Sequence, residues 1–201
     1  NKILASLAFL FSLFIYILTM APTTSFWDCG EFIATSIIMG VPHPPGTPFY
    51  LLLGNFFSQL PTFDDPGARV NLISPIFSAF AVMFLYLIIV QLIKEWFGEV
   101  KNWPDYLITY GSALIGALTF AFTDSHWFNA VEAEVYSLST FFTSIVVWLI
   151  LKWSSNSGHS GNVRYILIIA YMLGLAIGIH LLNLLALPFI ALIVYFNKYE
   201  F

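Results

Sequence analysis

The stretch Val70-Asn-Leu-Ile-Ser-Pro-Ile-Phe-Ser-Ala-Phe-Ala-Val-Met-Phe-Leu-Tyr-Leu-Ile-Ile-Val-Gln-Leu-Ile93 decides the fold, because it carries no charged residue and is long enough to cross a bilayer. A transmembrane helix needs about 20 consecutive, mostly apolar residues. Five further apolar segments flank this stretch, at Ile3–Met20, Tyr106–Phe122, Ser137–Leu151, Arg164–Ile179 and Leu181–Phe196. The sequence therefore predicts an all-α, polytopic membrane protein with about six transmembrane helices.

The last two segments are separated by very few residues. One interpretation is a tight hairpin of two spans, and the other is one long helix broken near His180. We favour the hairpin, because the fused segment would be much longer than the roughly 17–25 residues that a span requires.

The composition supports a membrane protein. The chain is 59% hydrophobic and 9% charged, with a mean hydropathy of +0.85, far from the usage of soluble domains. The net charge of −4 argues against a nucleic-acid partner, and the single cysteine, Cys29, excludes an intrachain disulfide and a cysteine-based metal site. No small-residue cleavage site follows Ile3–Met20, so this segment is expected to be a retained helix. The chain lacks an initial methionine, and we expect residues 1–201 to form one module at the N-terminal part of a longer protein.

The basic residues predict the orientation of the helices. If the six segments alternate across the bilayer, six basic residues fall on one face: Lys2, Lys94, Lys101, Lys152, Arg164 and Lys198. Arg69 alone falls on the opposite face. Lys and Arg are enriched in cytoplasmic loops, so the N-terminus is expected to be cytoplasmic and the Arg69 face external. In a bacterium this places the chain in the inner membrane, with the external face toward the periplasm.

The first external loop, residues 21–69, contains two further helical segments. Phe26–Met39 and Thr47–Leu60 are too short to span, and we expect interfacial amphipathic helices. Thr47 is a plausible N-cap with Pro48 at the first helical position. Between them, Val41-Pro-His-Pro-Pro-Gly46 predicts a rigid turn. On the cytoplasmic side, Ser154–Asn162 is a plain polar linker.

Two carboxylates in this loop are the candidate catalytic groups. Asp28 and Glu31 are three residues apart, so on a helix they share a face. Partial burial against the neighbouring aromatic residues would raise a carboxyl pKa toward the range of a general base. An alternative is that Ser25-x-x-Asp28 forms a capping box and Asp28 only closes a helix end. Glu31 has no such alternative role.

The second external loop, residues 123–136, carries another acidic pair. Glu132 and Glu134 are two apart, which predicts different helix faces and different roles. Asn129-x-x-Glu132 also resembles a cap, so Glu134 is the better candidate for chemistry. In the same loop, His126 is more readily explained as a structural residue than as a ligand-binding one.

An anion site is predicted near the second helical segment. Neighbouring prolines fix the backbone of His43, and the N-terminus of the Thr47 helix offers free amide groups. Arg69 is either a phosphate partner or an anchor for the following span, and His180 lies at the outer end of the fifth span. Carboxylates with histidines also permit a divalent metal, but no motif such as His-x-x-x-His supports one, so no cofactor is expected.

This pattern fits two classes of function. Carboxylates on two external loops with a phosphate site suit group transfer from a lipid-phosphate donor to an external acceptor. Acids and histidines in membranes also form proton relays, which would suit a transporter or flippase for a lipid-linked or small anionic substrate. A non-catalytic membrane subunit is a third interpretation.

Four motifs carry a resemblance that separates these alternatives. They are Ser25-Phe-Trp-Asp-Cys-Gly-Glu-Phe-Ile-Ala-Thr35, His43-Pro-Pro-Gly46, Val131-Glu-Ala-Glu-Val-Tyr-Ser137 and Gly174-Leu-Ala-Ile-Gly-Ile-His180. In this order they resemble a bacterial membrane family related to the protein O-mannosyltransferases, formerly classed only as a domain of unknown function. The resemblance implies a GT-C class glycosyltransferase fold with an external active site, a polyprenyl-phosphate sugar donor and inversion at the anomeric carbon.

The resemblance also implies residue roles. The acidic motif of the first external loop matches Asp28 and Glu31, either of which would be the base. The acids of the second loop match Glu132 and Glu134, of which Glu134 would orient the acceptor or the sugar. The expected reaction moves a sugar, with mannose suggested by the family, to Ser/Thr hydroxyls of exported proteins.

Overall fold

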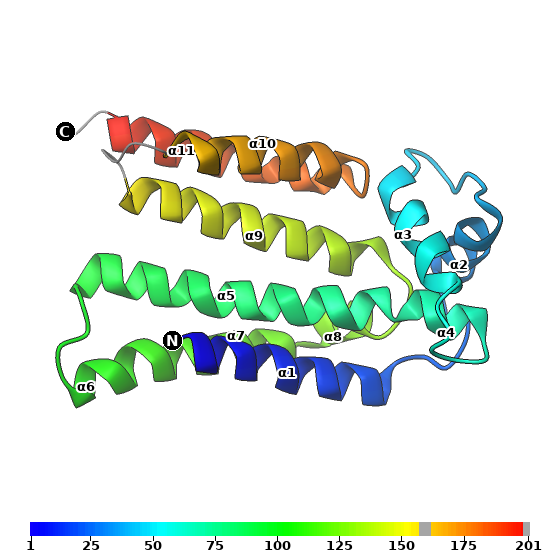
Figure 1. Cartoon of the computed structure of the whole chain (residues 1–201), viewed down its shortest axis with the longest axis horizontal. Helices are drawn as coiled ribbons and strands as arrows, with labels where there is room; N and C mark the ends of the chain where they lie inside the picture. The colour runs from blue at the N-terminus through cyan, green and yellow to red at the C-terminus, as the bar shows by residue number, and fades with distance from the viewer. Residues whose placement is uncertain (157–161, 199–201) are drawn as a thin grey trace.

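The computed structural model describes residues 1–156 and 162–198, and this part contains only helices and their connections (Figure 1). Residues 157–161 of the predicted linker lie outside it. The long helices run side by side along the long axis, and their bounds are α1 Lys2–Thr19, α5 Ile73–Phe97, α7 Ser112–Ala121, α9 Val135–Ser155, α10 Val163–Ile177 and α11 Ala186–Lys198. The shorter elements are α2 Cys29–Ile38, α3 Pro48–Ser58, α4 Pro66–Asn71, α6 Trp103–Tyr106, a π-helical turn at Leu107–Gly111, α8 Asp124–Ala130 and a 3₁₀ turn at Leu181–Leu185.

Helix α5 is the axis of the bundle, and most of it comes from the uncharged stretch Val70–Ile93. It packs against α1, α7 and α9. Its buried positions include small residues, among them Ser74, Ser78 and Ala79. Small side chains let helix backbones approach closely, which is the usual way in which helices associate in lipid.

Helix length supports fewer spans than the six predicted. Within residues 1–156 and 162–198, four helical segments are long and apolar enough to cross a membrane, at Lys2–Thr19, Pro66–Phe97, Val135–Ser155 and Leu181–Lys198. A fifth is present if Trp103–Ala121 and Asp124–Ala130, bent by 67°, form one broken span. The segment predicted as Arg164–Ile179 forms α10, which has only 15 residues. The chain reverses direction between α10 and α11, as the hairpin interpretation predicted (Figure 1).

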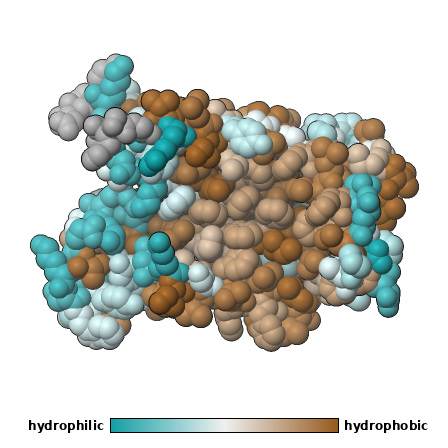
Figure 2. All heavy atoms as spheres, in the orientation of Figure 1, coloured by the Kyte–Doolittle hydropathy of each residue, from teal (hydrophilic) through white to brown (hydrophobic). Residues whose placement is uncertain are grey.

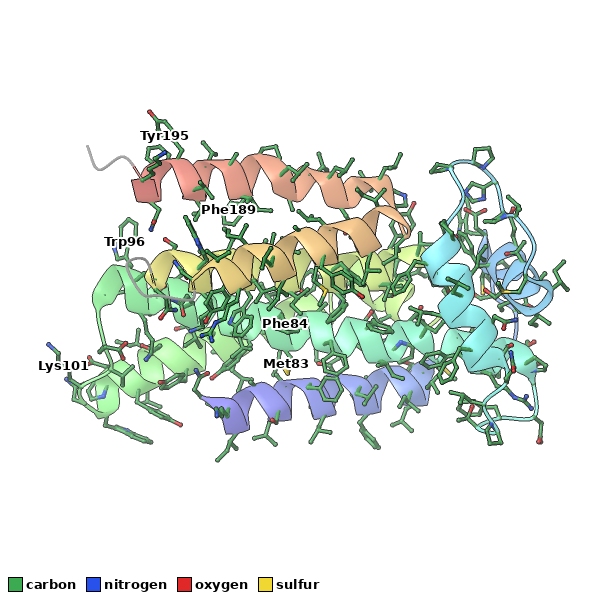
Figure 3. All side chains as sticks on the ribbon, turned by 45° about the horizontal axis from the view of Figure 1, so that its top comes forward. Met83, Phe84, Trp96, Lys101, Phe189 and Tyr195 are labelled. Atoms are coloured by element: carbon green, nitrogen blue, oxygen red, sulfur yellow. The ribbon has the colours of Figure 1, made fainter. Side chains whose placement is uncertain are left out.

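The surface has an apolar middle and two polar ends. Figure 2 shows a broad hydrophobic band between hydrophilic groups at the two ends of the long axis. The ends of α5, α9 and α11 that carry Lys94, Lys152 and Lys198 lie together, and Figure 3 shows Lys101 at that same end. Helices α2, α3 and α4 lie at the opposite end, with Arg69 on α4. The predicted separation of basic residues is therefore present in space.

Helices α2 and α3 form a packed pair that closes one end of the bundle. Phe32 and Tyr50 are buried in one core cluster with Val135 and Leu138 from α9 and with Ile179 from the turn after α10. The second helix begins at the predicted residues, with Pro48 in the first turn, although Thr47 at the N-cap position makes no capping hydrogen bond with its side chain. The first begins three residues later than predicted, because Trp27 adopts a φ of 56° that no helical residue has.

Candidate active site

Asp28 occupies the N-cap position of α2 without capping the helix. Its side chain accepts no hydrogen bond from the helix amides and is exposed. Ser25, the other half of the possible capping box, instead donates its backbone N–H to Cys29 Sγ at 3.5 Å. The capping alternative is therefore wrong for this helix. The left-handed backbone of Trp27 directly before Asp28 is costly for a bulky residue, and such conformations cluster at functional sites.

Glu31 and His43 form a two-point contact. Glu31 Oε1 accepts the backbone N–H of His43 at 2.7 Å, and Oε2 accepts the ring Nδ1–H at 2.7 Å. The predicted turn brings His43 into place, since Gly46 has a φ of 77° and donates its N–H to the His43 carbonyl at 3.0 Å. His43 lowers the pKa of Glu31, and Glu31 raises the pKa of His43. The expectation that burial would raise the pKa of Glu31 is wrong, because the hydrogen bonds from His43 outweigh it.

Glu134 is the acid whose pKa is raised. It lies at the N-cap of α9 and is only 5% exposed. Desolvation, followed by repulsion from Asp28 and Glu132, raises its pKa to about 7, although His43 opposes the shift. A carboxyl group with a pKa near the working pH is suited to general base catalysis.

Glu132 lies in the same connection and is almost completely buried, with Oε1 lacking a hydrogen-bond partner. The prediction that Glu132 and Glu134 occupy different faces of a helix is wrong, because both precede α9. Asn129 does not cap Glu132 either, since it lies within α8 and donates its amide to the Ser125 carbonyl at 2.7 Å.

The two loops that were predicted to be external therefore lie together at one place. Asp28, Glu31 and His43 each have a ligand atom within 4.8 Å of the others, so this group could hold one metal ion. The charges of Asp28 and His43 also act on Glu134. The structure thus brings His43 and the acids of the first loop within electrostatic reach of Glu134 in the second.

Asn71 joins these loops, and the sequence analysis missed it. Its side chain is fully buried and bonds to Ala21, Thr23 and Ala133. A carboxamide inside the apolar stretch Val70–Ile93 was a visible signal, because a buried polar group needs partners.

Arg69 is used within its own loop. Its guanidinium donates to three backbone carbonyls, those of Phe63, Ser58 and Asp64, at 2.6, 3.1 and 3.3 Å. Among the described residues, no hydrogen bond or ion pair joins Arg69 to Glu31 or His43. This geometry favours the anchoring alternative over a phosphate partner.

The two remaining histidines are held by other elements. His126 is buried on α8, with its ring centroid 4.2 Å from that of Phe120. His180 accepts the N–H of Leu182 on Nδ1 at 3.1 Å and lies beside the ring of Tyr136. Burial lowers the pKa of His180. Neither residue contacts the pair formed by Glu31 and His43 in the described part of the chain.

The start of α3 offers fewer free amide groups than the predicted anion site assumes. Pro48 has no N–H, and Phe49 donates its N–H to the carbonyl of Gly178 at 2.8 Å. The turn after α10 therefore uses the amide group that was expected to bind phosphate.

Comparisons with known proteins agree with the resemblance seen in the sequence. Residues 28–201 match the family described as the protein O-mannosyl-transferase TMEM260 N-terminal domain. The protein O-mannosyl-transferase tmem260 of Dictyostelium discoideum is 27% identical over 161 residues, which cover 79% of this chain and 18% of that protein. The mouse protein O-mannosyl-transferase TMEM260 is 26% identical over 163 residues, covering 81% of this chain and 21% of that protein.

The chain thus spans about a fifth of the length of these curated relatives. No solved structure matches it. Because the family match covers most of the chain, the chain belongs to the family of the protein O-mannosyl-transferase TMEM260 N-terminal domain.

Proposed function

We propose that this chain is the membrane core of an inverting, GT-C class glycosyltransferase that moves a sugar from a polyprenyl phosphate to a Ser/Thr hydroxyl of an exported protein. The relatives are named protein O-mannosyl-transferases, which favours mannose as the sugar. The observation that carries the proposal is the buried Glu134 carboxyl, whose pKa is raised by desolvation and by the charges of Asp28 and Glu132.

Glu134 is the proposed base. It takes the proton from the acceptor hydroxyl, whose oxygen then attacks the anomeric carbon while the bond from that carbon to the phosphate oxygen breaks. Glu31 is less suited to this role, since His43 lowers its pKa and occupies both of its oxygens. Asp28, which is exposed at the start of α2, remains available to the sugar or the acceptor.

His43 is the proposed partner of the leaving phosphate. Glu31 raises its pKa and holds Nδ1, so the opposite nitrogen, Nε2, can donate to a phosphate oxygen. A positioned donor or cation at the point where negative charge develops is a large contribution to catalysis. Protonated His43 with deprotonated Glu134 gives the required pair of an acid and a base.

The alternative of a transporter finds no particular support in the structure. A proton relay would place acids in the middle of spans. The described acids instead lie in the connections, in the short helices or at helix ends, such as Glu134 before α9 and Glu95 in the last turn of α5. The positive-inside bias suggests that the end of the bundle with Lys94, Lys101, Lys152 and Lys198, the lysine-rich end, is cytoplasmic. The proposed site at the opposite end would then face the exterior or periplasm.

The test is transfer of radiolabelled mannose from polyprenyl-phosphate mannose to acceptor protein, in membranes that contain the full-length protein. Glu134→Gln should reduce transfer by at least about 100-fold, the low end of what a general acid or base contributes. Asp64→Asn is the control, because Asp64 is an exposed acid of the first predicted external loop and lies outside the group formed by Asp28, Glu31, His43 and Glu134. Equal transfer by both variants would remove Glu134 from the mechanism, and no transfer by the parent protein would contradict the proposed reaction.

A further inference from the structure

Asn71, the last residue of α4, uses the whole hydrogen-bonding capacity of its side chain. Nδ2 donates to the carbonyls of Ala21 at 2.8 Å and Thr23 at 2.9 Å. Oδ1 accepts the N–H of Ala133 at 3.0 Å and lies 3.7 Å from Cys29 Sγ. A carboxamide has two donor hydrogens and two acceptor sites, so none is left unused.

These partners come from both loops of the proposed site. Ala21 and Thr23 lead from α1 toward Asp28, and Cys29 directly follows Asp28. Ala133 stands between Glu132 and Glu134. A backbone bond from Ala21 N–H to the Val131 carbonyl, at 2.8 Å, joins the same two segments a second time.

We propose that Asn71 is a positioning residue for the transfer reaction, which holds the Glu134 segment against the start of α2 and so fixes the separation of Glu134 from Asp28. The inference rests on the proposed role of Glu134. Asn71 does not itself reach the reacting groups, because its side chain is fully buried.

Loss of this side chain has a defined electrostatic consequence. The charged groups that act on Glu134 are Asp28, Glu132 and His43. If Ala133 is released, Glu134 moves away from Asp28 and gains water, and both changes lower its pKa toward the ordinary value of a glutamic acid. A base with a lower pKa remains deprotonated to lower pH, so the acidic limb of the pH–rate profile shifts in that direction.

The chain offers a matched control in a second buried asparagine. Asn183 donates to the carbonyls of Ala176 and His180, at 3.1 and 2.9 Å, and accepts the hydroxyls of Ser139 and Thr143, both at 3.1 Å. It therefore ties the turn after α10 to α9 as Asn71 ties the two acidic loops. Its loss should destabilise the fold without releasing Ala133.

The experiment compares Asn71→Ala, the milder Asn71→Ser and Asn183→Ala in the full-length protein, with thermal unfolding measured for each. A misplacement of about 1 Å costs on the order of 100-fold in rate, so we expect Asn71→Ala to lose about that factor in kcat. The acidic limb should shift to lower pH for the Asn71 variants and stay in place for Asn183→Ala. The inference would be overturned if the acidic limb of the pH–rate profile stayed at the parent's pH in folded Asn71 variants, or if it shifted equally in Asn183→Ala.

A second readout separates this inference from the proposed function. Infrared titration of the carboxyl band, with the Glu134→Gln spectrum subtracted, follows the protonation of Glu134 without any turnover. A lower Glu134 pKa in Asn71→Ser than in the parent supports the positioning role, and an unchanged one refutes it. Full activity of Glu134→Gln would instead refute the proposed function, whatever the infrared result.

Discussion

The two ends of the bundle differ in how their charged side chains are partnered and buried. At the lysine-rich end, Lys94 Nζ lies 2.7 Å from Glu99 Oε2, and Lys152 Nζ donates to Gln91 Oε1 at 2.8 Å, beside a recess of about 590 Å³. At the other end, Glu134 and Glu132 are buried near Asp28, and Glu132 Oε1 has no partner.

The difference indicates which end has a function beyond stability. Buried like charges are unfavourable for folding, since each carboxylate loses hydration and repels the others. Groups whose pKa values are shifted by burial and by specific neighbours are concentrated at functional sites. At the lysine-rich end, Lys94 is paired with an acid and Lys152 is bonded to a neutral amide, so neither charge is buried without a partner.

The largest effect in this comparison is expected from the pair formed by Glu31 and His43. His43→Gln should reduce transfer by about 100-fold or more, the range for removing one donor to a developing negative charge. Glu31→Gln should shift the alkaline limb of the pH–rate profile to lower pH, because Glu31 raises the pKa of His43 and keeps it protonated as the pH rises. The double variant should lose no more than the worse single variant, since the two residues act as a unit. Additive losses in kcat/KM would show that they act separately.

A smaller effect is expected where α2 crosses α3. A Cβ atom at Gly54 would overlap Ser36 Oγ and lie 2.6 Å from Ser36 Cβ, so Gly54→Ala must push the helices apart. We expect a loss of about 1–3 kcal/mol in the free energy of unfolding, with reduced transfer because α2 carries Glu31. Gly174→Ala on α10 is the control, because a Cβ there has open space. Equal stability of the two variants in thermal unfolding would contradict the close crossing.

The smallest effect is expected at the lysine-rich end. Lys94→Ala removes a partly exposed ion pair and Lys152→Ala removes a hydrogen bond to Gln91, and ion pairs near the surface contribute about 0–1 kcal/mol. Unfolding should change by no more than that amount, and the pH–rate profile should not move. A displaced acidic limb in either variant would link this end to the chemistry and weaken the contrast between the two ends.

The sequence predicted those features that depend on local patterns. The apolar stretch produced α5, Thr47-Pro48 marked the start of α3, and the prolines around His43 formed the expected turn. These outcomes follow from side-chain size, hydropathy and fixed φ angles, which act over a few residues.

The remaining features depend on contacts between distant segments. The pKa of Glu134 is raised partly by Asp28, which lies more than a hundred positions earlier in the chain. Arg69 was predicted to be a possible phosphate partner because the carbonyls of Ser58 and Phe63 could not be placed near it from sequence. The left-handed backbone of Trp27, which delays the start of α2, also has no local signal.

The central claim is that the contact between the two acidic loops raises the pKa of Glu134 and so lets it act as a base. The most direct test is the pH–rate profile of the full-length protein and of its Asp28→Asn variant. The parent should lose kcat/KM below about pH 7, where Glu134 becomes protonated. Asp28→Asn removes a repelling charge, so the pKa of Glu134 should fall and the acidic limb should move to lower pH. An acidic limb at the same pH in both proteins would contradict the account.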